Sequence, residues 1–373
     1  MKSIVVLGSG MVGRVIALDL SGTFDVTAVD VSRANLAGLE GTAVKPLRAD
    51  LSSPAALREI IAGCDLVMGA VPGSMGFATL REVIAAGKDV VDISFFPEDA
   101  LALDEAARAA GVTAVVDCGV APGMSNMILG YHAARMTVRT FACYVGGLPF
   151  RREFPFEYKA PFSPADVIEE YTRPARYIEN GHLVVRPALS DVENMDFPEI
   201  GTLEAFNSDG LRSLLATMKV PNMIEKTLRY PGHVGHIQAL RDSGFFDTEE
   251  IEVKGRRIRP LDVTSAVLFK RWRLREEDDE FTVMRIVIEG EDSGREKRIV
   301  YDLFDRKDRK TGFSSMARTT GFPATAAARL VLAGQFRRKG VSPPEFLGAE
   351  EALFKAVMDE LAAKNVVYRR TDR

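Results

Sequence analysis

The chain has 373 residues, of which 46% are hydrophobic and 27% are charged, so it is long enough to form two domains with large cores. Its 48 lysines and arginines against 52 aspartates and glutamates give a net charge of -4, which leaves no overall positive charge to attract nucleic acid. Three cysteines without paired spacing predict neither a disulfide framework nor a thiolate zinc site. The first apolar run, residues 4–7, is too short for a signal peptide or a membrane span, so we expect a cytoplasmic protein without membrane or nucleic-acid partners.

Short runs rich in valine and isoleucine alternate with helical stretches through the first 120 residues. In residues 55–62 and 97–110, apolar residues recur three and four positions apart, as they do on the buried face of a helix. Strands that alternate with helices predict a parallel, doubly wound sheet of the Rossmann type. The six predicted strands are residues 3–7, 26–29, 44–47, 66–71, 89–93 and 114–118.

The pattern changes after residue 120. A helical segment at residues 125–136 precedes longer strand runs, with hairpin signals at Asn180-Gly181 and at residues 292–294. These features predict a second α+β domain with a mainly antiparallel sheet. From residue 319 the sequence is helical again, and we expect this last stretch to return to the first domain.

A glycine-rich turn, Gly8-Ser9-Gly10-Met11-Val12-Gly13, directly follows the first predicted strand and opens an apolar helix. With this spacing the first glycine permits a tight turn, the second lets the backbone approach a pyrophosphate, and the third lets helix and strand pack closely. Asp30 ends the second strand 22 residues after Gly8, where a carboxylate accepts hydrogen bonds from a ribose. The residues predicted to bind a nicotinamide dinucleotide here are Gly8, Gly10, Met11, Val12, Gly13 and Asp30.

The same carboxylate favours NAD over NADP, because Asp30 would repel a 2'-phosphate. Arg33 lies three residues downstream and keeps NADP as the less favoured alternative. Strand order places further residues at the cofactor, and these are Asp50 near the adenine, Ala70, Val71 and Pro72 near the nicotinamide ribose, and Cys118 and Gly119 beside the nicotinamide.

Five short segments rich in glycine, proline and aromatic residues follow one another along the chain. They are VDISFFPED at residues 91–99, GVAPG at 119–123, GGLP at 146–149, YKAPFSP at 158–164 and TLRYPGH at 227–233. In this order, behind a dinucleotide-binding turn, they resemble the landmarks of the saccharopine dehydrogenase (saccharopine reductase) family. Within that family the sequence is most similar to the lysine 6-dehydrogenase-like branch.

The resemblance implies a Rossmann domain built from two chain segments, residues 1–122 and 314–373. A substrate-binding and dimerisation domain, residues 123–313, would be inserted between them. It also implies NAD(P)-dependent oxidation of a C–N bond in an amino acid that carries a side-chain amine. Ala121 stands where saccharopine reductases usually have an aspartate, which weakens the case for recognition of the glutamyl half of saccharopine. We expect a homodimer, because hairpin-rich second domains often pair across a two-fold axis.

Oxidation of an amine requires a neutral nitrogen, so a base must take its proton or a dry pocket must depress a pKa that is ordinarily about 10.4. Asp92 leaves the fifth strand at its carboxyl end, where ligands bind in open α/β sheets, and is predicted as the amine anchor and candidate base. Its alternative role is to cap the helix that begins near Pro97. Ser94 and Phe95, in the same landmark, are predicted to contact the substrate.

A guanidinium is the expected partner of the substrate's α-carboxylate. Arg229 is the first candidate, and Arg173 and Arg176 compete for the same role. Tyr158 and Lys159 are expected to face the cleft, with Lys159 acting either as a base or as the partner of a carboxylate.

His233 and His236 lie three residues apart and would share a helix face. No third ligand is spaced with them and hydride transfer to nicotinamide needs no metal, so no metal site is predicted. His233 is interpreted either as a substrate contact and proton shuttle or as a structural histidine.

The leading hypothesis is therefore an NAD-dependent L-lysine 6-dehydrogenase, whose imine product hydrolyses to ammonia and a semialdehyde that cyclises. The second is a saccharopine- or carboxyspermidine-type dehydrogenase that acts on a secondary amine. A third, from another class, is a non-catalytic nucleotide-binding regulator. The retention of Asp92, Tyr158, Lys159 and Arg229 argues against this third hypothesis.

Overall fold

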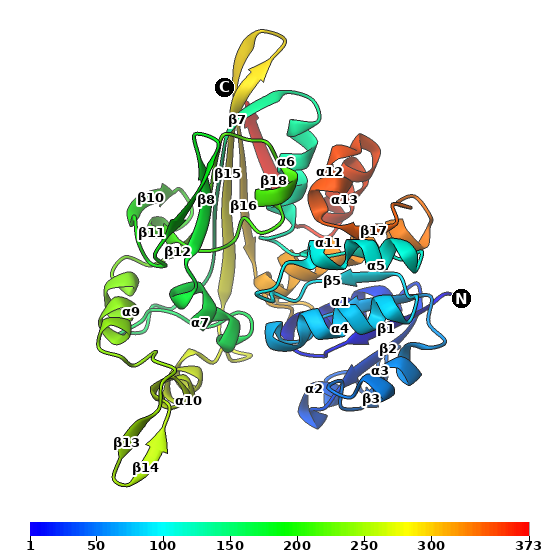
Figure 1. The fold of residues 1–373 in the computed structure, drawn as a ribbon, viewed down its shortest axis with the longest axis horizontal. Coiled ribbons are helices and arrows are strands. Elements are labelled where there is room, and N and C mark those ends of the chain that lie inside the picture. Colours follow the sequence, from blue (N-terminus) through cyan, green and yellow to red (C-terminus); the bar gives the residue numbers. More distant parts are fainter. Residues whose placement is uncertain (373) are drawn as a thin grey trace.

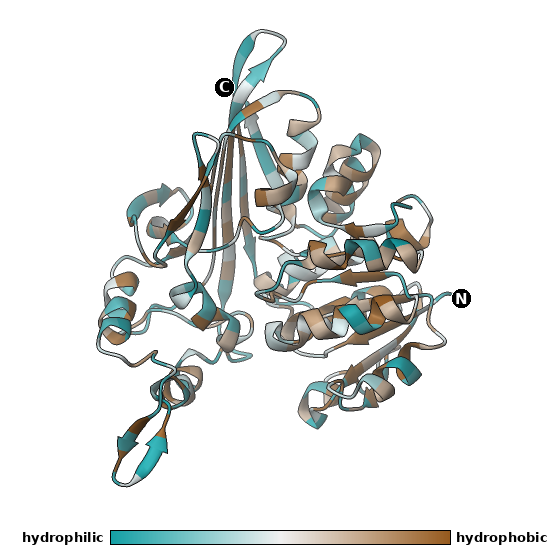
Figure 2. Cartoon of the chain, in the orientation of Figure 1, coloured by the Kyte–Doolittle hydropathy of each residue, from teal (hydrophilic) through white to brown (hydrophobic). Residues whose placement is uncertain are grey.

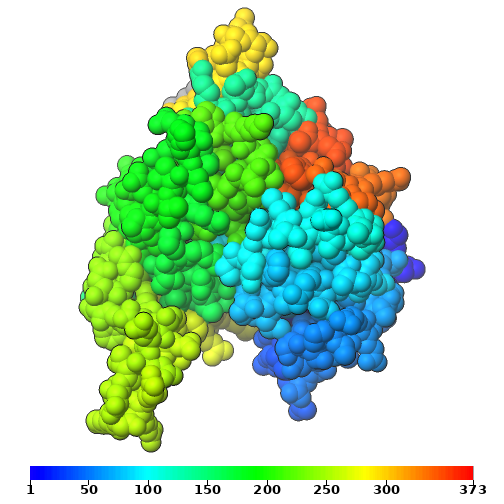
Figure 3. Space-filling view, viewed as in Figure 1, coloured from blue at the N-terminus to red at the C-terminus, as the bar shows by residue number. Residues whose placement is uncertain are grey.

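The computed structural model describes residues 1–372 and contains two large sheets with helices packed around them (Figure 1). One sheet has seven strands and the other has nine, and a separate two-stranded ribbon projects from the body of the molecule. The predicted fold class is confirmed, because the first sheet is parallel and the second is mixed and mainly antiparallel. In the space-filling view the N-terminal residues and the residues of the second sheet form two masses that touch (Figure 3).

The first sheet contains all six predicted strands, in the order β17-β6-β5-β4-β1-β2-β3. A short strand near the C-terminus, which was not predicted, adds the seventh at the edge next to β6. The strand order reverses between β1 and β4, and in open α/β sheets such a reversal opens a ligand crevice outside the carboxyl ends of the strands. The strands are β1 (Ser3–Leu7), β2 (Asp25–Asp30), β3 (Lys45–Arg48), β4 (Leu66–Gly69), β5 (Val90–Asp92), β6 (Thr113–Val115) and β17 (Gly340–Ser342).

Helices cover both faces of this sheet. The helix predicted at residues 97–110 is divided into a 3-10 turn at Ala100–Leu103 and an α-helix at Asp104–Ala109. Ser32 and Ser53 cap the N-termini of their helices, because each side chain accepts a hydrogen bond from a backbone N–H of the first turn. The helices around the first sheet are α1 (Met11–Ser21), α2 (Arg33–Ala37), α3 (Pro54–Ile61), α4 (Gly73–Ala85), α5 (Asp104–Ala109) and α11 (Ser315–Leu332).

The second sheet has the order β10-β11-β12-β7-β15-β16-β18, with β8 and β9 attached beside β12. Both predicted hairpins occur, and their turns use left-handed backbone at Asn180 (φ 49°) and Ser293 (φ 55°), each followed by glycine. The one parallel pairing in this sheet joins β7 to β12. Its strands are β7 (Thr137–Pro149), β8 (Ala175–Glu179), β9 (His182–Arg186), β10 (Glu193–Phe197), β11 (Gly201–Asn207), β12 (Asn222–Arg229), β15 (Glu280–Asp292), β16 (Arg295–Arg306) and β18 (Tyr368–Asp372).

The remaining helices are α6 (Met124–Ala133), α7 (Pro164–Thr172), α8 (Leu214–Thr217), α9 (His233–Asp242), α10 (Pro260–Trp272), α12 (Pro344–Ala349) and α13 (Glu351–Ala363). Helix α6 packs against β7 of the second sheet, and α12 and α13 pack on α6 and also contact β17 and α11 of the first sheet, respectively. None of the helices in residues 1–372 combines the length and apolar character needed to cross a membrane. The projecting ribbon is formed by β13 (Ile251–Val253) and β14 (Arg256–Ile258).

The C-terminal stretch contacts both sheets. Helix α11 packs against α1 and β17 pairs with β6, so this part of the chain lies with the first sheet, as predicted. Strand β18 differs, because it pairs antiparallel with β16 in the second sheet. The predicted domain bounds at residues 122/123 and 313/314 stay a prediction, and the pairing of β18 assigns residues 368–372 to the second sheet.

The core follows this layout. One apolar cluster joins the α1 and α11 side of the first sheet to the inner face of the second sheet, with Ile16, Phe322, Phe141 and Ile286 all buried in it. A second cluster fills the opposite face of the first sheet, and a third, aromatic one surrounds Trp272. In Figure 2 the strands of the first sheet are coloured as apolar, and hydrophilic residues gather on outer helices and loop tips.

Candidate active site

The glycine turn after β1 has the geometry that a dinucleotide requires. Gly8 has φ +98°, and a Cβ at this position would lie 2.3 Å from the carbonyl oxygen of Ala70. A Cβ on Gly13 would lie 2.1 Å from the carbonyl oxygen of Gly8, so both positions need glycine for close packing. Gly10 differs, because a Cβ there would meet nothing within 4 Å among the described residues. The backbone at Gly10 therefore faces open space at the start of α1, which fits the close approach of a pyrophosphate.

Asp30 lies at the end of β2 beside this turn. Its carboxylate accepts hydrogen bonds from the backbone N–H of Ser9 (2.8 Å) and of Ser32 (2.7 Å), and from Nδ2 of Asn35 (3.1 Å). These bonds fix the carboxylate, and two carboxylate oxygens still leave a lone pair for a ribose hydroxyl. Arg33 is exposed on the first turn of α2.

One cavity of about 590 Å³ joins the carboxyl ends of the first sheet's strands to one face of the second sheet. Most of the predicted cofactor residues line it, and so do three of the predicted substrate residues. The predicted residues in its lining are Gly8, Gly10, Met11, Val12, Gly13, Asp30, Asp50, Ala70, Val71, Pro72, Ser94, Phe95, Gly119 and Arg229.

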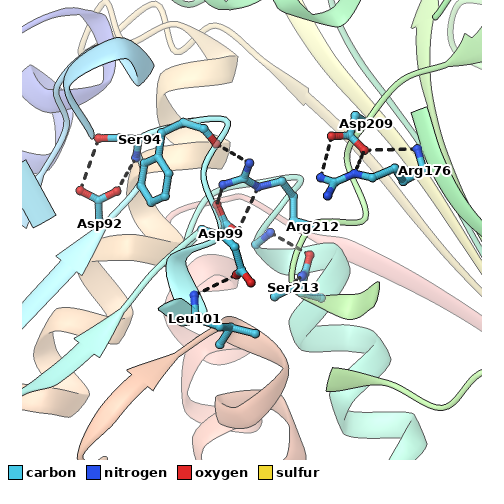
Figure 4. A network of polar contacts seen from close by, with 12 residues as sticks. Asp92, Ser94, Asp99, Leu101, Arg176, Asp209, Arg212 and Ser213 are labelled. Carbon is cyan, nitrogen blue, oxygen red and sulfur yellow. Dashed lines mark hydrogen bonds and ion pairs between the residues drawn. The ribbon is translucent and has the colours of Figure 1, made fainter. Parts of the chain in front are cut away.

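The far side of the cavity is a strongly charged surface, which we call the inner wall. Arg229 donates to Glu170 at 2.6 Å and Arg173 donates to Glu169 at 3.1 Å. Arg176, just outside the lining, donates to Asp209 at 2.8 Å, and this pair is shown in Figure 4. The inner wall consists of Asp166, Glu169, Glu170, Arg173, Ser208, Asp209, Gly210, Glu225, Thr227 and Arg229.

Arg229 is the centre of a buried network. Besides Glu170, its guanidinium donates to the hydroxyl of Tyr171 (3.2 Å), the hydroxyl of Tyr158 (3.4 Å) and the carbonyl of Leu228 (3.0 Å), and the side chain is 2% exposed. Tyr158 is buried under the guanidinium, with its ring 4.3 Å from the central carbon. Arg229 thus uses most of its donors on the protein itself.

Lys159 and His233 lie in the second part of the chain but are not in the cavity lining. Nζ of Lys159 lies 3.2 Å from a carboxylate oxygen of Glu153 and donates to the carbonyl of Arg271. His233 bridges the hydroxyl of Tyr171 (2.9 Å) and the carbonyl of Phe156 (2.8 Å), and burial lowers its pKa to about 3. A neutral, enclosed imidazole fits the structural interpretation of His233.

Asp92 lies beneath the cavity instead of in its lining. The side chain is 1% exposed and accepts hydrogen bonds from the backbone N–H (2.8 Å) and the hydroxyl (3.3 Å) of Ser94, which does line the cavity (Figure 4). Burial, together with the negative charge of nearby Asp117, raises the pKa of Asp92 to about 8, although the hydrogen bonds from Ser94 act in the opposite direction. Cys118 is also fully buried, and burial raises the pKa of its thiol to about 12. Neither Asp92 nor Cys118 is among the residues that line the cavity.

The five acidic residues of the inner wall were not predicted. Asp166, Glu169 and Glu170 come from α7, Asp209 from the loop after β11, and Glu225 from β12. Of these residues, only Glu225 could have been identified from the sequence. It lies on the same face of a strand as Met223 and Thr227, and a carboxylate is unexpected on a buried strand face. The others lie in loops and helices where acidic residues are ordinary.

Two family models match the chain. The saccharopine dehydrogenase NADP binding domain matches residues 4–115, and the saccharopine dehydrogenase C-terminal domain matches residues 119–366. The chain belongs to the saccharopine dehydrogenase family. The resemblance drawn from the five sequence segments is confirmed at this level.

Individual relatives agree with the family. A saccharopine dehydrogenase [NADP(+), L-glutamate-forming] from Pyricularia oryzae is 29% identical over 268 residues, covering 67% of this chain and 59% of that protein. A carboxyaminopropylagmatine dehydrogenase from Synechocystis is 22% identical, covering 95% of each chain. An apo saccharopine dehydrogenase (L-Glu forming) from Saccharomyces cerevisiae, a solved structure, has a TM-score of 0.80 at 20% identity with all of both chains covered.

The match spans about three fifths of the Pyricularia family member. It spans 22% of an α-aminoadipic semialdehyde synthase from Arabidopsis thaliana. The substrates in these names are not lysine, so the relatives do not support the predicted lysine 6-dehydrogenase-like branch. Membership is established only at the level of the saccharopine dehydrogenase family.

Proposed function

We propose that the protein is an NAD(P)-dependent dehydrogenase that oxidises the C–N bond of an amine on an amino-acid substrate. The observation that carries this proposal is the single cavity, which joins the glycine turn of the first sheet to the charged inner wall of the second. A dinucleotide and a small charged amine placed in one cavity can react directly, as hydride transfer requires.

The residues of the first sheet suit the cofactor's shape and charge. The turn at Gly8–Gly13 and the start of α1 would hold the diphosphate, and Asp30 would accept a hydrogen bond from the adenosine ribose. A bound nicotinamide dinucleotide supplies the hydride acceptor. The apolar side chains of Val71, Ile93 and Phe162 in the lining would exclude water from the reacting carbon.

NAD is the proposed cofactor. Asp30 is held against Ser9 and Ser32 by backbone hydrogen bonds, so it stays where a 2'-phosphate would have to lie, and its charge opposes that phosphate. The matched family model and the Pyricularia relative are named for NADP, so NADP is the alternative to be measured beside NAD.

Asp92 is proposed to act by positioning. It fixes Ser94 through two hydrogen bonds and thereby shapes the loop whose residues 93–95 line the cavity. Arg229 is proposed to orient Glu170 of the inner wall and to be held itself by the buried hydroxyls of Tyr158 and Tyr171, which gives the substrate a rigid charged surface.

L-lysine is the first candidate substrate, because its side-chain amine is the simplest group that a wall of carboxylates attracts. A secondary amine is the second candidate, and the names of the Pyricularia and Synechocystis relatives favour it. A lysine-type reaction forms the reduced cofactor from one amine, whereas the reverse of a saccharopine-type reaction consumes it only when an aldehyde or keto acid and an amine are both present.

The test is a substrate screen in which the absorbance of the reduced nicotinamide is followed with NAD and with NADP. Lysine, saccharopine and carboxyalkylated diamines are the oxidative arms, and amine plus carbonyl pairs are the reductive arms. Turnover of any of them supports the proposal. Tight dinucleotide binding without turnover of any amine would instead support a nucleotide-binding regulator.

A further inference from the structure

The inner wall contains one acidic group that its neighbours leave unmatched. Three of its carboxylates pair with arginines, namely Glu169 with Arg173, Glu170 with Arg229 and Asp209 with Arg176. Asp166 lies against Gly73, the first residue of α4; burial raises its pKa to about 6, and the hydroxyl of Ser163 and the backbone N–H of Gly73 act against that rise. Glu225 has no arginine or lysine within ion-pair distance among residues 1–372.

Glu225 projects from the middle of β12, between β11 and β7 in the second sheet. The residue is 3% exposed and lines the cavity, and its Oε1 lies so close to Gly210 that a Cβ there would come within 1.7 Å of it. Oε2 is buried and has no hydrogen-bond partner in the part of the chain that the structure describes. An unpartnered buried carboxyl oxygen is destabilising, so its presence in a cavity wall indicates a ligand that completes it.

The charges around Glu225 favour a positive ligand. Asp209 from the loop after β11, Glu170 from α7 and Asp117 from the loop after β6 all act on it, and Arg212 opposes them. Cys143 of the neighbouring strand β7 is a buried thiol with its pKa raised well above the usual value, so it adds no charge at neutral pH. Burial, with these carboxylates, raises the pKa of Glu225 to about 8.

We infer that Glu225 receives a cationic terminus of the substrate, an ammonium or a guanidinium. The inference rests on the proposed function of the cavity and specifies its substrate class. The substrate is then a diamine, a guanidino compound or a diamino acid whose positive end points to the inner wall, and a substrate with a carboxylate at this end is disfavoured. Glu225 is the residue that determines this specificity.

Binding of a cation at Glu225 is expected to change the protonation state of its carboxyl group. The carboxyl group is mostly protonated at neutral pH in the free protein, and a cation beside it favours the charged form. Binding of a cation therefore releases a proton to the solvent. Calorimetry in two buffers of different ionisation enthalpy measures that release directly.

The experiment uses the dinucleotide-loaded protein and measures binding instead of turnover. The probes are 1,5-diaminopentane, agmatine and glutarate, titrated by calorimetry near pH 7 into wild type, Glu225→Gln and the control Glu289→Gln. Glu289 is a partly exposed glutamate of β15 outside the cavity lining, so its variant makes the same chemical change elsewhere in the sheet.

We expect a diamine or agmatine to bind wild type and the control with release of a proton. In Glu225→Gln we expect binding to be weaker by about tenfold or more, with the proton release lost and the dinucleotide affinity unchanged. The inference is overturned if neither cation binds wild type, if Glu225→Gln binds them equally well, or if glutarate binds more tightly. Failure of the substrate screen with cation binding intact would overturn the proposed reaction and leave the inference standing.

Discussion

The two ends of the cavity are built in different ways. The dinucleotide end is made mainly of backbone, with Gly8, Gly10 and Gly13 giving a turn whose shape permits close approach. The inner wall is made of charged side chains from α7, β12 and a loop, held by ion pairs with each other. The comparison indicates that cofactor binding depends on the shape of the backbone, whereas the choice of substrate depends on the charges of side chains.

The largest expected effect comes from Arg229→Met at the inner wall. It leaves Glu170 without its partner and two tyrosine hydroxyls without a donor, so we expect a loss of roughly 3 kcal/mol in the free energy of unfolding. Denaturant unfolding measures it, with Arg58→Met, which breaks an exposed pair with Glu82, as a control expected to lose less than about 1 kcal/mol. Full stability with a raised KM for the amine would instead show that Arg229 binds substrate directly.

The dinucleotide end is tested by Gly10→Val. The new side chain enters open space in the cavity, so we expect the fold to keep its stability while the Kd for the dinucleotide rises about 100-fold, or about 2.7 kcal/mol. Fluorescence of the bound reduced cofactor measures the Kd. Gly22→Val at the end of α1 is the matched control, because its Cβ also meets nothing within 4 Å among the described residues but lies outside the lining. Equal affinity in both variants would contradict the placement of the diphosphate.

At the dinucleotide end, the charge of Asp30 is expected to determine the preference between NAD and NADP. Asp30→Ser removes the carboxylate that opposes a 2'-phosphate, so we expect the ratio of kcat/KM for NADP to that for NAD to rise about tenfold, or about 1.4 kcal/mol. Asp50→Ser, which removes an exposed carboxylate from the same lining, should change the ratio little. If wild type already prefers NADP and Asp30→Ser leaves the ratio of kcat/KM values unchanged, Asp30 does not select between the two cofactors.

The smallest effect on the rate is expected for Asp92→Asn. Asp92 acts through Ser94, so we expect kcat to fall no more than about threefold, because an uncharged amide retains the shape of the side chain. A general base that is removed typically costs 10²- to 10⁴-fold, and a loss of that size would restore Asp92 as the catalytic base.

The pH dependence of stability gives a second measure of Asp92. Its folded-state pKa of about 8 exceeds the ordinary 3.8, so the folded protein binds more protons than the unfolded chain between these values. The stabilisation from its protonated form is complete at low pH and is lost as pH rises toward about 8. We expect thermal unfolding of Asp92→Asn to depend less steeply on pH than that of wild type between about pH 5 and pH 8, with a remaining slope to which the other buried carboxyl groups Asp166, Glu225 and Glu280 contribute.

The parts of the site that depend on local sequence were predictable. The turn at Gly8–Gly13 and the acidic end of β2 are set by spacing within 30 residues, and both lie where they were placed. The burial of Asp92 was not predictable. Its position at the end of a strand shows at which edge of the sheet it lies, but does not determine how exposed its side chain is. His233 was ambiguous for the same reason, since only tertiary packing places Tyr171 and Phe156 against its ring.

The composition of the inner wall could not be predicted from local sequence patterns. Glu170, Asp209 and Glu225 are separated by tens of residues and meet because α7 and β12 pack beside one another through Tyr171 and Arg229. The short β17 was missed because three residues, Gly340–Ser342, give too little pattern to separate a strand from a loop. Strand β18 was not predicted, because apart from the buried Tyr368 its sequence is polar and exposed and carries little pattern.

The course of the chain after α11 limits how this protein can have been assembled in evolution. Strand β17 completes the first sheet, and β18, some 25 residues later, completes the second. A recombination event with a single crossover in the gene would deliver one sheet without its edge strand. Loss of the residues after α11 would likewise remove one edge strand from each sheet at once, so this segment ties the two sheets to each other.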